Sequence, residues 1–224
     1  MLTNSEVRKR ARRVLEGNWG TAVFAAVVYY VIVLGLSSCV SIPFAYNLWI
    51  SNGSSVLMTL LCMPLSWGFT VFFLSFVRNQ EKPVGALFDG YKRVGRIWLA
   101  MFLKTLYVFL WTLLLVVPGI MKSMSYAMME FILLDNPDMD AEDAIHRSRV
   151  MMDGHKMKLF LLYLSFIGWA ILCLFTLGFG FLLLVPYIQT SLATFYQDLV
   201  DENARCADKG EGVNEAGQAM PDSL

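Results

Sequence analysis

The sequence predicts an all-α fold, built as a polytopic helical bundle in a membrane. Of the 224 residues, 57% are hydrophobic and only 16% are charged, whereas an ordinary soluble domain has roughly 25% charged residues. Apolar runs of about 20 residues, the length that crosses a bilayer as a helix, recur along the chain. The positions of lysine and arginine then give the number of crossings, because these residues collect on the cytoplasmic side.

Five apolar runs are long enough to span a membrane: residues 20–42, 56–77, 97–117, 157–175 and 179–200. The first two contain no charged residue, and the third contains only Lys104. The first run follows a basic segment and contains LSSC at 36–39, which resembles the cleavage site of a lipoprotein signal peptide. Its apolar part is longer than that of a signal peptide, and further spans follow it, so we interpret it as an uncleaved helix.

Residues 118–134 form a sixth, short apolar segment that carries Lys122 and Glu130. A crossing here places 16 of the 18 lysines and arginines, together with both termini, in the cytoplasm. The alternative is a re-entrant hairpin that dips into the membrane and returns, which needs protein or water around it. We therefore predict six spans in one domain, residues 1–200, and a disordered cytoplasmic tail at 201–224 because that tail is polar and contains several glycines.

Each outward span follows a stretch with helical periodicity, at 3–17, 84–94 and 138–153. The first has the capping-box spacing Thr3–Glu6 and a basic face that we expect to contact anionic lipid headgroups. That face consists of Arg8, Lys9, Arg10, Arg12 and Arg13.

Each return span contains one proline, at Pro64, Pro118 or Pro186. This order suggests three parallel units, a known way to build membrane proteins, although apolar segments also resemble one another by chance. The three prolines are candidate helix breaks that make a binding site. The simpler alternative is that they only kink their helices.

Lys104 and Glu130 lie at similar depths in neighbouring antiparallel spans, so an intramembrane charge pair between them is geometrically feasible. Pairing is the usual way in which a membrane tolerates buried charge. The simpler interpretation, which we prefer from the sequence alone, is that each side chain reaches the headgroups separately.

No catalytic, cofactor-binding or metal-binding set is recognisable. The two histidines, His146 and His155, lack the spacing of a metalloprotease, and no phosphate-binding or nucleophile motif occurs. The four cysteines suggest neither a disulfide framework nor a zinc site. The formal net charge is zero, so nothing points to nucleic acid. We expect a protein that is not an enzyme and needs no cofactor.

Between Pro118 and Tyr196 the chain contains the motifs PGI at 118–120, DNP at 135–137, LSFIGW at 164–169 and PY at 186–187. With these motifs it resembles a bacterial family named domain of unknown function 975, and the N-terminal RARRVLEGNWGTAVF is similar to the start of that family. It implies a multi-pass membrane protein of the bacterial cytoplasmic membrane. It implies no activity, and it brings no catalytic residues.

The function we expect first is structural, lipid-associated or accessory, with anionic headgroups and another membrane protein as partners. The alternative is a transporter or facilitator for a small solute or a lipid, with its site near the proline-bearing spans. The sequence names no substrate.

Overall fold

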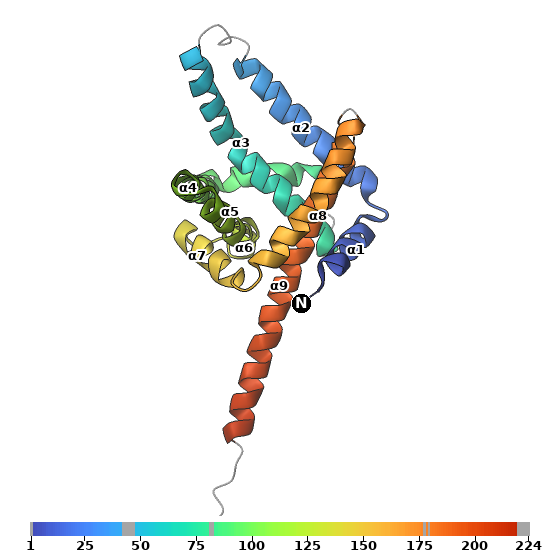
Figure 1. Ribbon diagram of the computed structural model, residues 1–224, viewed down its shortest axis with the longest axis vertical. Helices are drawn as coiled ribbons and strands as arrows, with labels where there is room; N and C mark the ends of the chain where they lie inside the picture. The colour runs from blue at the N-terminus through green and yellow to red at the C-terminus, as the bar shows by residue number, and fades with distance from the viewer. Residues whose placement is uncertain (1, 42–47, 81–82, 177, 179, 219–224) are drawn as a thin grey trace, which may run out of the picture.

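A computed structural model describes residues 2–41, 48–80, 83–176, 178 and 180–218. The described part of the chain is all helical, without strands (Figure 1). Its elements, in chain order, are α1 (Asn4–Leu15), α2 (Trp19–Ser41), α3 (Leu48–Val77), the 3-10 helix η2 (Val84–Arg93), α4 (Val94–Leu114), α5 (Val116–Ser125), α6 (Met129–Asp135), α7 (Ala141–Met151), α8 (Lys156–Phe175) and α9 (Phe181–Gln218).

Within the described residues, four helices are long and apolar enough to cross a membrane: α2, α3, α4 and α8. This confirms a helical protein of membrane type. Residues 60–77 of α3 are largely enclosed by the other helices, whereas α2, α4 and α8 expose most of their apolar surface. Figure 1 shows α2 and α3 running beside each other away from the other helices, with α4 and α5 pointing toward the viewer. An apolar exterior around one enclosed helix is the distribution expected of a protein whose solvent is lipid.

The predicted short span at 118–134 is not one helix. It is divided into α5 and α6 by a turn at 126–128. In a continuous helix the Met129 amide would bond to the Ser125 carbonyl, but it bonds to the Tyr126 carbonyl instead. The Ser125 carbonyl accepts from the Ser148 hydroxyl of α7, at 2.9 Å. A side chain from α7 thus occupies the carbonyl that would accept the next hydrogen bond of α5.

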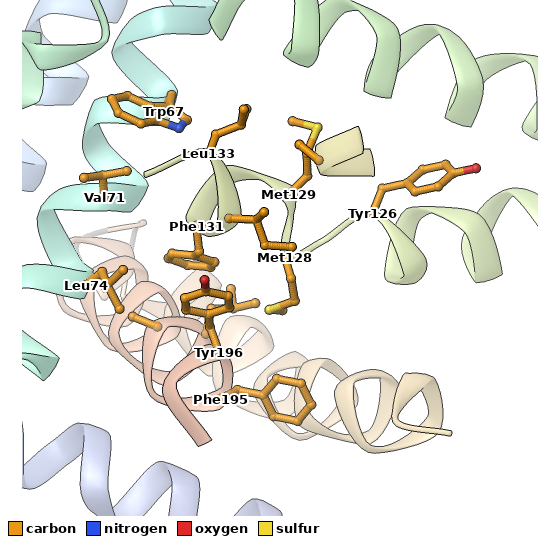
Figure 2. Packing of buried hydrophobic residues seen from close by; sticks show 14 of the residues in the cluster. Trp67, Val71, Leu74, Tyr126, Met128, Met129, Phe131, Leu133, Phe195 and Tyr196 are labelled. Carbon is orange, nitrogen blue, oxygen red and sulfur yellow. The ribbon is translucent and has the colours of Figure 1, made fainter. Parts of the chain in front are cut away.

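The core lies where α6 packs against α3 and α9 (Figure 2). Phe131 of α6 stacks on Tyr196 of α9, with ring centroids 5.0 Å apart, and Met128 and Met129 are fully buried beside them. The Trp67 indole of α3 donates to the Glu130 carbonyl at 3.0 Å. The short helix α6 is therefore held by both stacking and hydrogen bonding to its neighbours.

The N-terminal helix α1 begins and ends as its sequence predicts, and the capping box between Thr3 and Glu6 forms. Its apolar residues Val7, Ala11 and Leu15 are buried, because they pack on the protein, chiefly on α9. The apolar face of α1 is therefore covered by the protein itself. Only the basic side of α1 remains available for headgroups.

The helix α7 buries the residues that its periodicity predicts, Ala141, Ala144, Ile145 and Ser148. It ends before Gly154, whose φ of 74° suits a glycine after a helix. The segment η2 differs from the α-helical expectation. As a 3-10 helix it aligns residues three apart, so Leu87 and Gly90 face α3 while Phe88 and Tyr91 are exposed.

The prolines do not break their helices. Pro64 and Pro186 lie inside α3 and α9, which continue through them, and Pro118 lies in the first turn of α5, where a missing amide costs little. Pro64 leaves the Leu60 carbonyl without its helical donor. The Trp98 indole of α4 supplies a replacement, with its Nε1 3.2 Å from that oxygen.

The expected disordered tail at 201–224 continues α9 as helix as far as Gln218, and residues 219–224 lie outside the described part of the chain. Once the packed part of α9 has formed, each further residue adds a hydrogen bond without a new nucleus. Figure 1 shows this end of α9 projecting away from the other helices.

Candidate ligand-binding cavity

A cavity of about 490 Å³ lies at the centre of the helices. Every apolar segment of the chain contributes to its wall: α2 through Tyr29 and Tyr30, α3 through Ser66 and Thr70, α4 through Lys104, the α5–α6 segment through Ser123 and Glu130, α8 through Tyr163, and α9 through Gln189. Its volume falls within the range of roughly 300–1,000 Å³ typical of small-molecule sites.

Lys104 and Glu130 meet on the wall of this cavity. The Lys104 Nζ lies 2.7 Å from the Glu130 Oε1. Their side chains are 22% and 14% exposed, so both charges are mostly enclosed and depend on each other. The structure thus brings together the two residues that we expected to reach the headgroups separately.

The turn between α5 and α6 positions Glu130. Because α6 starts only at Met129, Glu130 lies in its first turn. There the partial positive charge at the helix N-terminus stabilises a carboxylate. The Trp67 indole fixes the Glu130 backbone through its carbonyl. Lys104 comes from the middle of α4, which packs antiparallel on α5.

Several polar groups on the cavity wall have no protein partner. Among the described residues, neither the Gln189 amide nor the hydroxyls of Tyr29, Tyr30 and Tyr163 form a hydrogen bond with another residue. The hydroxyls of Ser66, Thr70 and Ser123 bond to carbonyls of their own helices and can still accept. Such groups need water or a ligand inside the cavity.

Lys122, the remaining charge in the predicted spans, does not reach the cavity. Its Nζ lies 4.7 Å from the centre of the Trp111 ring, an arrangement in which the ring face stabilises the cation. The prolines lie close to the cavity in sequence, because lining residues follow Pro64, Pro118 and Pro186 within six positions in each segment. The five basic residues of α1 do not line it.

A second polar network joins α3, α6 and α9 and was not found from the sequence. Arg78, at the end of α3, binds both carboxylate oxygens of Asp135, at 2.6 and 2.8 Å, and its Nε donates to Gln197 at 3.1 Å. The Tyr196 hydroxyl donates to the same carboxylate at 2.7 Å. The DNP motif was visible in the sequence, but its distant partner was not.

The Asp135 network predicts a pH dependence of stability. Burial alone would raise the pKa of Asp135, but the hydrogen bonds from Arg78 and Tyr196 and the nearby charges of Arg78 and Arg147 outweigh it and lower the pKa. Because the folded-state pKa is depressed, this contribution is fully present above the unfolded-state value of about 3.9 and is lost as pH falls toward the folded-state value.

We therefore expect wild type to melt at a higher temperature than Asp135→Asn at pH 7, with the difference shrinking as the pH falls below about 4. Melting curves of both proteins in one detergent from pH 7 to pH 3 test this. An Asp138→Asn variant is the control, since Asp138 is fully exposed. A constant gap down to pH 3 would contradict the assignment.

Among the described residues, no cluster of three or more histidine, cysteine or acidic side chains is arranged to hold a metal ion. Cys39, Cys62 and Cys173 are free thiols.

Comparison with known proteins gives one match. The model of a family described as protein of unknown function (DUF975) matches residues 1–125 and 108–203. Neither the curated proteins nor the solved structures contain a match. The two matched ranges together include every helix that lines the cavity. The chain therefore belongs to the DUF975 family.

Proposed function

We propose that this protein is a multi-pass protein of a bacterial cytoplasmic membrane that binds a small polar solute in its central cavity and facilitates its passage. The observation that carries the proposal is the cavity itself, which contains an ion pair and unpartnered polar groups at the meeting point of all the apolar segments. Discontinuous segments around a central site are a common feature of transporters, and the α5–α6 turn supplies one here.

The proposed topology has six crossings and both termini in the cytoplasm. The four apolar helices support four of the crossings. The α5–α6 segment and the first part of α9 would be the remaining two, the α5–α6 turn being tolerated because protein surrounds it. The re-entrant alternative for 118–134 fits the same turn. The distribution of lysine and arginine favours the crossing.

The packing of the short helices supports the proposed three-unit repeat. The units are α1–α2–α3, η2–α4–α5–α6 and α7–α8–α9. In each case the short first helix packs on the return segment of the preceding unit: η2 on α3, α7 on α6, and α1 on α9. The last contact closes a ring, as a cyclic arrangement of three related units requires.

The charges of the cavity favour a zwitterionic solute. The wall carries one cation and one anion, which neutralise each other. A ligand with a single net charge would leave either Lys104 or Glu130 facing a like charge, and unpaired charge in an enclosed site is costly. A ligand with one charge of each sign can give both residues a new partner.

The proposal predicts a selective gain in thermal stability, because a ligand that binds only the folded state stabilises it. Three probes share a four-carbon chain: 4-aminobutyrate, butyrate and butylammonium. We expect 4-aminobutyrate to raise the melting temperature of the full-length protein in detergent, and the other two to leave it unchanged.

Two variants connect the gain to the cavity. Tyr163→Phe removes a hydroxyl from the wall and should weaken the response to 4-aminobutyrate, whereas Tyr107→Phe removes one outside it and should not. No response to any probe, or equal responses to all three, would refute a zwitterion site.

A second candidate role is that of a lipid-associated or accessory protein that is not an enzyme. The observation that favours it is the basic side of α1. Among the described residues, none of Arg8, Lys9, Arg10, Arg12 and Arg13 forms an ion pair. Such a helix suits the anionic headgroups of the cytoplasmic leaflet, while its apolar face anchors it to the protein.

A further inference from the structure

A groove of about 410 Å³ lies between the junction of α1 and α2 and the hairpin of α8 and α9. Its wall is mostly apolar, with Trp19, Trp169, Leu172 and Leu183 among the lining residues. Of the described residues that line it, only Arg12 is charged. No residue lines both this groove and the central cavity. The groove is therefore a separate site.

The helix α1 is fixed in place beside the groove. The Leu2 amide donates to the buried carboxylate of Asp198 at 2.8 Å, and the Asn4 amide group donates to the Lys158 carbonyl at 3.0 Å. The Tyr187 hydroxyl, on the groove wall, donates to the Arg8 carbonyl at 3.4 Å. These contacts fix the backbone of α1 beside the groove, so only the Arg12 side chain has to be ordered when a ligand arrives.

The charge at the groove has no counterion among the described residues. Arg12 is exposed, and no described carboxylate pairs with it. A guanidinium matches the geometry of a phosphate, to which it can donate two parallel hydrogen bonds. An apolar wall with a single cation at one end fits a molecule that combines a hydrocarbon chain with an anionic head.

We propose that this groove binds one anionic phospholipid, with its phosphate on Arg12 and an acyl chain against Trp169 and Leu172 of α8 and Leu183 of α9. Tryptophan is enriched where membrane proteins meet lipid headgroups, and Trp19 lies at the start of α2, seven residues after Arg12. The inference rests on the lipid-associated role proposed above. It makes that role specific, because one lipid molecule bound in a defined groove replaces diffuse attraction to headgroups.

Native mass spectrometry of the full-length protein in a neutral detergent tests the proposal. The probes are dioleoylphosphatidylglycerol, which is anionic, and dioleoylphosphatidylcholine, which has the same chains and no net charge. We expect wild type to retain one phosphatidylglycerol and to exchange phosphatidylcholine freely.

Two matched pairs of variants locate the lipid. Arg12→Gln should weaken retention about tenfold, equal to about 1.4 kcal/mol, whereas Arg13→Gln removes the same charge from the same helix without touching the groove. Leu172→Trp should fill the groove and displace the acyl chain. Leu174→Trp is its control, because both leucines are exposed on α8 and only Leu172 lines the groove.

The outcomes separate the groove from the broader role. If Arg12→Gln and Arg13→Gln reduced phosphatidylglycerol retention equally, and Leu172→Trp did not reduce it, the groove would not be the lipid site. Only diffuse attraction to headgroups would then remain. Equal retention of both lipids by wild type would overturn the lipid-associated role as well.

Discussion

Removing either charge of the Lys104–Glu130 pair is expected to lower the free energy of unfolding by about 3 kcal/mol. Loss of one partner leaves the other as an enclosed, uncompensated charge, which typically costs 3–5 kcal/mol. We expect the lower end of that range, because the two side chains are still 22% and 14% exposed and water in the cavity can solvate them. Unfolding of Lys104→Met and Glu130→Gln in one detergent measures the loss.

The decisive variant exchanges the two charges. Lys104→Glu combined with Glu130→Lys keeps the pair and should recover most of the stability that either single substitution loses, a coupling that a double-mutant cycle measures directly. Lys122→Met is the control, because Lys122 contacts only the Trp111 ring in this region and should cost about 0.5–1 kcal/mol. Independent, additive effects of the two single substitutions would show that the pair contributes nothing as a pair.

Gly90→Ala is expected to destabilise the protein by about 3 kcal/mol, at the upper end of typical overpacking costs. A Cβ on Gly90 would collide with the Pro64 carbonyl of α3. The colliding atoms belong to the backbone of α3, which cannot change its conformation as a flexible side chain could. Gly68 makes the reciprocal contact, since its Cβ would collide with the Leu87 carbonyl of η2, and Gly68→Ala should have an effect of similar size.

Gly85→Ala is the matched control for the glycine prediction. It lies on the same 3-10 helix, and a Cβ there meets nothing within 4 Å, so the substitution should change stability by less than about 0.5 kcal/mol. Thermal melting in detergent compares the three variants. If the Gly90→Ala and Gly85→Ala variants had the same melting temperature, the close packing of η2 on α3 would be refuted.

The glycine substitutions and the substitutions of the ion pair should affect the cavity in different ways. The glycine contacts fix η2 against α3, which supplies Ser66 and Thr70 to the cavity wall. The ion pair lies on the wall itself. A glycine variant should therefore weaken 4-aminobutyrate binding only through loss of folded protein, whereas a variant at Lys104 or Glu130 should weaken it even where the protein remains folded.

Local sequence determined several features of this protein. The apolar runs gave the helices α2, α3, α4 and α8, because a bilayer sets the length of such runs. The spacing of Thr3 and Glu6 gave the start of α1, and periodicity gave the buried face of α7. In each case the interaction that fixes the structure lies within one or two helical turns, so it is visible in the sequence.

The tertiary structure alone decided the rest. The Ser148 hydroxyl ends α5 across 23 residues, and Trp98 compensates for Pro64 across the α3–α4 connection. Arg78 binds Asp135 at the end of α6 and Gln197 inside α9. The sequence left open whether Lys104 and Glu130 pair, because depth along two helices does not fix how those helices are rotated. Rotation is set by packing of whole faces, here of α6 against α3 and α9, and that packing has no short-range signature in the chain.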